Sequence, residues 1–126
     1  MYTFKKEERL CNKRLIEGLY HNGSSFLCYP FKVAWLPAPT GNVPAQVVFV
    51  VAKKRYKHAV DRNLVKRRMR EAYRLHKQQF LYDQLIAGSR QLALSVTYIG
   101  TEILAYDIME KKMLKMLLQL SDQATK

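Results

Sequence analysis

The chain has 126 residues, of which 48% are hydrophobic and 25% charged, and its formal net charge at pH 7 is +12. This composition indicates a single globular domain over residues 1–126 and excludes an intrinsically disordered chain. A basic excess of this size favours a polyanionic partner. The apolar runs are too short to span a bilayer, and residues 1–10 hold no apolar signal core, so we expect neither a membrane span nor secretion.

The first third of the chain predicts one helix and one long strand. A helical apolar stripe over residues 12–23 begins at Asn12, a good N-cap, and ends at a glycine. Residues 25–37 are rich in β-branched and aromatic side chains and predict a strand. Pro30 within it favours an edge position or a bulge.

The rest of the chain predicts two more strands and two more helices. Residues 45–53 and 91–100 predict strands with apolar interiors. A helix is expected from an Asp61 N-cap to about residue 80, and another over residues 105–121. The order is α–β–β–α–β–α, which predicts an α+β fold: a two-layer α/β sandwich with a single sheet packed by helices.

The helix that follows Asp61 separates into an apolar face and a basic face on a helical wheel. Half of the 22 Lys and Arg residues lie between Lys53 and Lys77, with only two acids. Solvated helix faces usually mix both signs, and like charges three or four residues apart repel. Contact with a phosphate backbone offsets this repulsion, because each contact releases condensed counterions. The basic face comprises Asn63, Lys66, Arg67, Arg70, Arg74 and Lys77.

Other residue types give weaker signals. Exposed aromatic residues suit stacking on unpaired bases, and Tyr20, Phe31 and Tyr56 are candidates, although for Phe31 a core position is the more common role. The two cysteines have no metal-ligand spacing, and we expect both to be reduced. No catalytic motif is present, and His58 is the only loose candidate for an acid or base.

The stretch AVDRNLVKRRMRE, residues 59–71, resembles the signature of the protein component of bacterial ribonuclease P. That signature reads Ala-Val, any residue, Arg-Asn, two residues, Lys-Arg, two residues, then Arg and Glu or Gln. The preceding VVAKK (50–54) resembles the strand that leads into it, and residues 9–23 resemble the first helix of the family. The resemblance covers roughly residues 4–120.

The resemblance implies a function in tRNA maturation. Family members bind a large catalytic RNA, and together they remove the 5′ leader from precursor tRNA. The RNA carries out the hydrolysis with Mg²⁺, so the protein would be a subunit of an endoribonuclease with no catalytic residues of its own. The expected partners are the catalytic RNA and precursor tRNA, with no DNA or membrane, in the cytoplasm. The family fold also implies an uncommon left-handed β–α–β crossover.

Site residues follow from the resemblance by position. Residues expected to bind the catalytic RNA are Lys53, Lys54, Arg62, Asn63, Lys66, Arg67, Arg70 and Arg74. Ile16 and Tyr20 match the leader-facing positions of the first helix, and Phe31 and Tyr56 complete the candidate leader-binding set.

This chain departs from the family pattern in three places. Leu64 replaces an Arg that often follows Arg-Asn, the loop 55–58 is longer and bulkier, and Ile16 replaces a common Phe. Two other functions stay open at this point. A ribosomal-type protein would bind ribosomal RNA without assisting catalysis, whereas a protein-only nuclease would cleave precursor tRNA unaided and depend on His58.

Overall fold

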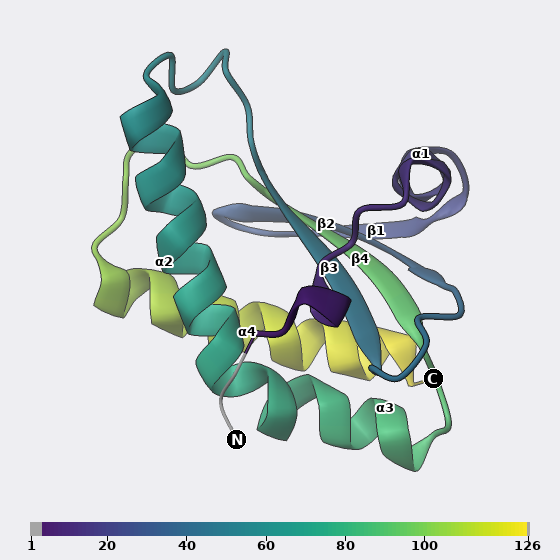
Figure 1. Ribbon diagram of the computed structural model, residues 1–126. Coiled ribbons are helices and arrows are strands. Elements are labelled where there is room, and N and C mark those ends of the chain that lie inside the picture. The colour runs from purple at the N-terminus through teal and green to yellow at the C-terminus, as the bar shows by residue number, and fades with distance from the viewer. Residues whose placement is uncertain (1–3, 126) are drawn as a thin grey trace.

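The computed structural model describes residues 4–125, so residues 1–3 and 126 of the expected 1–126 domain lie outside the described part. One four-stranded sheet has helices on both faces (Figure 1). In chain order the strands are β1 (Ser24–Cys28), β2 (Phe31–Pro37), β3 (Ala45–Val51) and β4 (Leu92–Tyr98). The α-helices are α1 (Lys13–Asn22), α2 (Ala59–Lys77), α3 (Asp83–Ala87) and α4 (Tyr106–Ala124).

The helix α1 begins and ends where the sequence predicts. The side chain of Asn12 accepts hydrogen bonds from the N–H groups of Arg14 and Leu15, as expected of an N-cap. Leu19 is buried on the sheet, and Leu15 and Ile16 pack beside it against a small cluster that includes Leu10. The apolar stripe therefore fixes α1 on one face of the sheet, opposite α2 and α4 (Figure 1).

The prediction of one strand over residues 25–37 is wrong. The segment forms two antiparallel strands, with Ser24 paired to Trp35 and Cys28 paired to Phe31. Tyr29 and Pro30 form the turn, where a residue without an N–H group breaks no ladder hydrogen bond. The order is therefore α–β–β–β–α–β–α, and the expected α+β class with one sheet packed by helices is confirmed.

The sheet is mixed and has the order β1-β2-β4-β3. Strand β4 runs antiparallel to β2 and parallel to β3, with Val47 opposite Leu94. Because β3 and β4 are parallel neighbours, the chain between them crosses over through α2 and α3. The left-handed sense of this crossover stays a prediction from the family resemblance.

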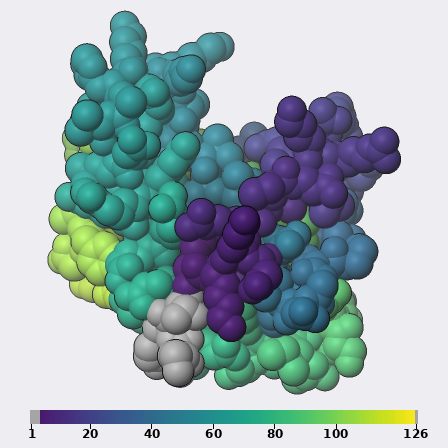
Figure 2. Space-filling model, in the orientation of Figure 1, coloured from purple at the N-terminus to yellow at the C-terminus, as the bar shows by residue number. Residues whose placement is uncertain are grey.

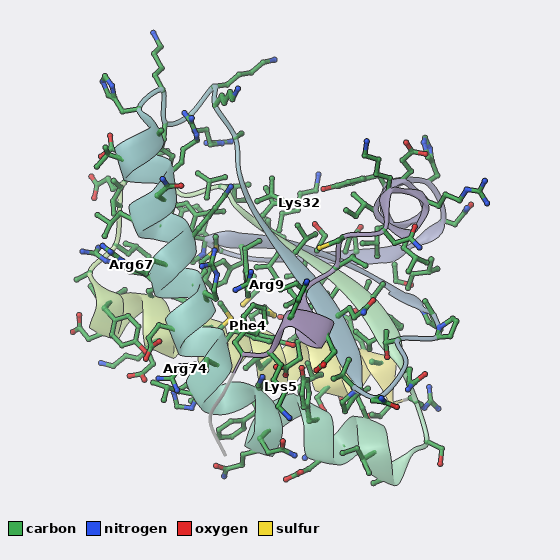
Figure 3. All side chains as sticks on the ribbon, in the orientation of Figure 1. Phe4, Lys5, Arg9, Lys32, Arg67 and Arg74 are labelled. Atoms are coloured by element: carbon green, nitrogen blue, oxygen red, sulfur yellow. The ribbon has the colours of Figure 1, made fainter. Side chains whose placement is uncertain are left out.

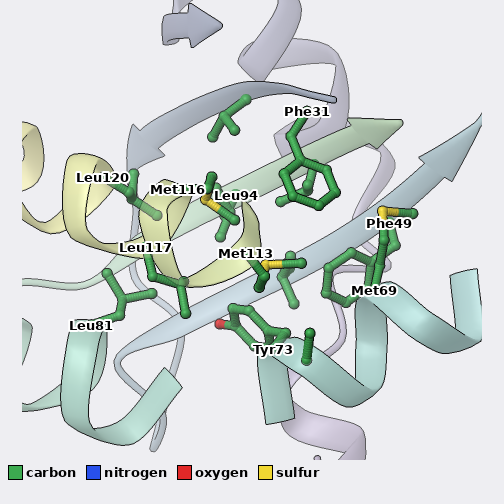
Figure 4. Packing of buried hydrophobic residues seen from close by; sticks show 14 of the residues in the cluster. Phe31, Phe49, Met69, Tyr73, Leu81, Leu94, Met113, Met116, Leu117 and Leu120 are labelled. Atoms are coloured by element: carbon green, nitrogen blue, oxygen red, sulfur yellow. The ribbon is translucent and has the colours of Figure 1, made fainter. Parts of the chain in front are cut away.

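The main core lies between the sheet and the layer formed by α2 and α4 (Figure 4). Alternate strand residues, among them Val33, Phe49 and Val96, point into it. From α4, a methionine and leucine face contributes Met113, Met116, Leu117 and Leu120, all fully buried. The methionines of this helix are core packing, as the apolar stripe of the sequence indicates.

Two helices, α2 and α4, have boundaries that differ from the prediction. Helix α2 begins at Ala59, so Asp61 lies in its first turn and is not its N-cap; the N-cap is His58, without a side-chain hydrogen bond. After Lys77 the chain continues through a π-helical turn, η2 (Gln78–Tyr82), into α3. Helix α4 extends to Ala124, three residues beyond its predicted end.

Within residues 4–125, no helix is both long enough and apolar enough to cross a membrane.

Candidate nucleic-acid interface

Four polar residues line the exposed side of α2. Asn63, Arg67 and Arg70 are exposed and Lys66 is half-buried, and with Val60 and Leu64 they line a shallow depression of about 410 Å³. Their spacing of three and four residues places them on one side of the helix, while Val65, Met69 and Tyr73 enter the core. Asn63, Lys66, Arg67 and Arg70 are called the basic face of α2 below.

The loop before α2 adds further cations at the same end of the molecule. Lys53 and Lys54 are exposed in the turn that follows β3. Arg62 has a second role, because its guanidinium donates hydrogen bonds to the carbonyl oxygens of Tyr56 and Lys57, both at 2.8 Å. This side chain therefore fastens the longer 55–58 loop to the first turn of α2.

Arg74 and Lys77 do not belong to the exposed basic face, contrary to the helical wheel. Arg74 forms an ion pair with Glu71, three residues earlier, through two nitrogens. Lys77 is only 3% exposed and pairs with Glu8, which comes from the N-terminal segment. Both cations are held by carboxylates of the same chain, so the exposed basic face is shorter than the helical wheel predicts, and RNA binding by Arg74 stays a prediction.

A second feature lies on the other face of the sheet, beside α1. Tyr20 is 59% exposed, and its hydroxyl is hydrogen-bonded to that of Ser95 at 3.3 Å. Next to its ring the sheet is hollowed by a cleft of about 310 Å³. The cleft is lined by Leu19, Tyr20, Gly23, Ser25, Lys32, Ala34, Val50, Ser95 and Thr97.

Of the other three candidate leader-binding residues, none lines this cleft. Phe31 is fully buried, and its ring packs edge-on against Tyr98 on the core side of the sheet. Tyr56 is half-buried beside the same Tyr98, and its hydroxyl donates to the carbonyl oxygen of Gly100 at 2.7 Å. Ile16 is half-buried against the small cluster beneath α1. The expectation that Phe31 stacks on the leader is therefore wrong, because its ring is in the core, and leader binding by Tyr56 and Ile16 stays a prediction.

The only strand residue that the sequence assigned to leader binding was Phe31, although a signal for the strand residues of the cleft was present. Lys32 alternates with the buried Phe31 and Val33 along β2, and Ser95 alternates with Leu94 and Val96 along β4. A polar residue out of phase with a buried row lies on the opposite sheet face. The missing information was strand order, which brings β2 and β4 together under α1.

The basic face offers few oxygen ligands for a metal ion. Asn63 supplies the only side-chain oxygen among the residues lining that depression, beside three cations. Mg²⁺ prefers carboxylate and phosphate oxygens, so this donor set does not fit a resident Mg²⁺. Among residues 4–125, no group of three or more His, Cys, Asp and Glu side chains is placed to hold a metal ion.

The fold and the site define a class: a small α+β protein with a cationic helix on one side of a mixed sheet and an aromatic-edged cleft on the other. A sequence model of the family described as Ribonuclease P matches residues 4–105. The chain belongs to the ribonuclease P protein family.

Named relatives agree with this assignment. The chain is 32% identical to the ribonuclease P protein component of Porphyromonas gingivalis, over 95% of this chain and 88% of that protein. It is 35% identical to that of Chlorobium phaeobacteroides, over 78% of this chain and 73% of that protein.

Solved structures show the same fold. The Staphylococcus aureus RNase P protein aligns with a TM-score of 0.71 at 18% identity, covering 94% of this chain and 98% of that one. The Thermotoga maritima RNase P protein aligns with a TM-score of 0.69 at 22% identity, covering 89% and 96%.

Proposed function

We propose that this chain is the protein subunit of a ribonuclease P ribonucleoprotein. It binds the catalytic RNA and the 5′ leader of precursor tRNA, and it supports Mg²⁺-dependent removal of that leader in the cytoplasm. The hydrolysis belongs to the RNA partner, which also binds most of the Mg²⁺. The protein itself binds both polyanions, the catalytic RNA and the precursor tRNA, and holds them close to each other.

The observation that carries this proposal is the basic face of α2. Within residues 4–125, no ion pair involves Lys66, Arg67 or Arg70, in contrast to Arg74 and Lys77. Cations held close together without carboxylate partners repel one another, and a phosphate chain removes that repulsion by releasing its own counterions. Arginine planes also match phosphate oxygens with two parallel hydrogen bonds.

The cleft beside Tyr20 supports the second half of the proposal. An exposed aromatic ring, a lysine and several hydroxyl groups border it. Unpaired bases stack on aromatic rings, and hydroxyl groups bond to base edges or to sugar 2′-OH groups. A single-stranded leader presents unpaired bases, whereas mature tRNA lacks that segment, so the cleft distinguishes the two ligands.

Reconstitution tests the proposal. The protein, added to ribonuclease P RNA, is expected to allow 5′ leader removal at an Mg²⁺ concentration too low for the RNA alone. Arg70→Ala is expected to raise the Mg²⁺ requirement, because it removes one phosphate contact. Lys115→Ala, which removes an exposed cation from α4, is the matched control and is expected to behave as the wild type.

Two results would count against the proposal. One is a Mg²⁺ requirement that the wild-type protein does not change. The other is an equal effect of Arg70→Ala and Lys115→Ala, because loss of charge anywhere on the surface would then explain the data. RNA recovered with the protein from cells should be one species of a few hundred nucleotides; ribosomal RNA would favour the ribosomal-type alternative.

A further inference from the structure

A groove runs along the outer edge of β3, between the N-terminal segment and α2. Its volume is about 220 Å³. Arg9 contributes from the N-terminal segment, and Lys66 and Arg70 contribute from α2. The remaining lining residues are Phe4, Leu10, Cys11, Val47, Val48 and Phe49. This surface is called the edge groove below.

The N-terminal wall of the edge groove is attached to β3 by its backbone. The N–H of Leu10 donates to the carbonyl oxygen of Val47 at 2.9 Å, and Arg9 bridges to Val47 in parallel register. One step earlier, the side-chain amide of Gln46 donates to the carbonyl oxygen of Glu7 at 2.9 Å. The segment therefore extends the sheet edge for a short distance and fixes where Arg9 lies.

A buried charge pair anchors the same segment to α2. Glu8 is 4% exposed, and one of its carboxylate oxygens accepts from Lys77 and, at 2.7 Å, from the hydroxyl of Tyr82. Phe4 packs edge-on against Tyr73 of α2, with ring centroids 5.9 Å apart. Because breaking a buried pair is strongly unfavourable, the two walls of the groove keep their separation.

Arg9 has no carboxylate partner within residues 4–125. Its guanidinium lies 5.8 Å from the centre of the Phe4 ring, and Figure 3 shows it between α2 and the sheet. Figure 2 shows the N-terminal segment seated against α2 at this place. Three cations from two separate segments thus line one groove that no acid lines.

We propose that the edge groove binds a phosphodiester of the catalytic RNA, held jointly by Arg9, Lys66 and Arg70. This inference rests on the proposed function, because it requires the basic face of α2 to lie on RNA. It adds a residue outside the signature helix to the interface. The apolar floor lowers the local dielectric and strengthens each cation–phosphate contact relative to an open surface. A ribose can lie on that floor while its phosphate meets the cations.

A salt titration with matched variants tests the shared contact. Arg9→Ala is expected to weaken binding of ribonuclease P RNA and to reduce the slope of log K against log[salt] by at most about 0.7–0.9, the value of one whole phosphate contact, because Lys66 and Arg70 still contact the shared phosphate. Lys6→Ala is the control, because this exposed cation lies three residues away and does not line the groove. It is expected to leave the slope unchanged.

A double-mutant cycle then tests whether the walls hold one phosphate. If Arg9 and Arg70 share it, the fold-loss of affinity in the Arg9→Ala/Arg70→Ala double variant is smaller than the product of the two single losses. Losses for Lys6→Ala and Arg70→Ala are expected to multiply. Thermal unfolding of each variant confirms that the fold is intact.

The two cysteines provide an independent reading of the same groove. Cys11 is exposed on its lining, whereas Cys28 is buried in the core, and both are free thiols. Ribonuclease P RNA is expected to slow alkylation of Cys11 by iodoacetamide several-fold. The reaction of Cys28 in unfolded protein gives the reference rate. Inorganic phosphate at the same ionic strength is expected to give no protection.

The outcomes separate the two proposals. Suppose that the wild type binds the RNA and lowers its Mg²⁺ requirement, but that Arg9→Ala and Lys6→Ala bind RNA with the same affinity and salt slope and Cys11 stays reactive. The assignment of the edge groove to RNA is then wrong, and the proposed function stands. Protection of Cys11 by inorganic phosphate alone would assign the groove to free anions and overturn its assignment to RNA. If the wild type does not bind the RNA, both proposals fail.

Discussion

Tyr20 combines exposure with a fixed position, and this combination gives the first prediction at the scale of single residues. Its ring borders the cleft, and its hydroxyl is hydrogen-bonded to the hydroxyl of Ser95. Stacking of a base on an aromatic ring contributes about 1–3 kcal/mol, so Tyr20→Ala should weaken precursor tRNA binding by roughly 5- to 150-fold. Binding of mature tRNA by the reconstituted holoenzyme should be unchanged. Equilibrium binding of both tRNAs measures the difference.

Two variants control for this result. Tyr20→Phe keeps the ring and should retain most of the discrimination. Tyr29→Ala removes a tyrosine of similar exposure, 54%, that lies in the turn after β1 and does not line the cleft. Equal losses of affinity for precursor and mature tRNA in Tyr20→Ala would show that Tyr20 only supports the packing of α1.

Arg62 and Arg70 carry the same charge but differ in their contacts. Arg62 donates to two loop carbonyl oxygens, whereas Arg70 is exposed on the basic face. We expect Arg62→Ala to lower the free energy of unfolding by about 1–2 kcal/mol, because hydrogen bonds from a charged group are lost. Arg70→Ala should change it by less than about 0.5 kcal/mol. Urea unfolding of the free protein measures both, and equal losses would contradict the assignment.

At the scale of the elements, helix positions and strand composition were predictable because they depend on local pattern. The Asn12 cap, the apolar face of α4 and the apolar composition of β3 all follow from neighbouring residues. The turn at Tyr29 and Pro30 was missed because a β-rich stretch on both sides resembles one long strand. The sequence did contain its signal, a proline in the middle of that stretch.

The candidate site was predictable only where it lies on one element. The basic face of α2 follows from helical periodicity, whereas the candidate role of Tyr20 on α1 came from the family resemblance. Lys77 was misplaced because its partner Glu8 is 69 residues away, and Phe31 because strand phase depends on the turn before it. Arg9 was missed for the same reason: its neighbour Val47 joins it only through sheet pairing.

The pair of Glu8 and Lys77 joins the N-terminal segment to α2 and gives a prediction at this scale. Replacing Glu8 by Gln leaves a buried lysine without a counter-charge, which costs about 3–5 kcal/mol. The double variant Glu8→Gln/Lys77→Met should recover much of the loss, because a buried pair replaced by uncharged residues is often neutral. Urea unfolding at pH 7 measures all three proteins. A double variant no more stable than Glu8→Gln would contradict this account.

The same pair predicts how stability depends on pH. Burial alone would raise the pKa of Glu8, but hydrogen bonds from Lys77, Tyr82 and the N–H of Lys5 outweigh it and leave the pKa below its ordinary value of 4.5. The stabilisation is therefore present above pH 4.5 and is lost as the pH falls through the lower folded-state pKa. The wild type should lose stability more steeply than Glu8→Gln in this acid range. Parallel curves for the two proteins would exclude the contribution of Glu8.

At the scale of the whole molecule, the net charge of +12 has opposite consequences for the free and the bound protein. In the free protein, like charges on α2 and in its preceding loop repel, and salt screens them because the Debye length falls from about 30 Å at 0.01 M to about 8 Å at 0.15 M. The melting temperature of the free protein should therefore rise with salt. In the complex, salt competes with the cations for phosphate.

The salt dependence of RNA binding is set by five exposed or half-buried cations: Lys53, Lys54, Lys66, Arg67 and Arg70. At 0.7–0.9 per phosphate contact, one phosphate for each cation gives a slope of at most about −4 for log K against log[salt], so affinity should fall by up to roughly 250-fold between 50 and 200 mM. Thermal melts of the free protein and RNA binding, measured over the same salt series, check both signs. If stability and affinity change in the same direction with salt, the cations are neutralised by carboxylates of the same chain. The basic face of α2 is then not a binding surface for a polyanion.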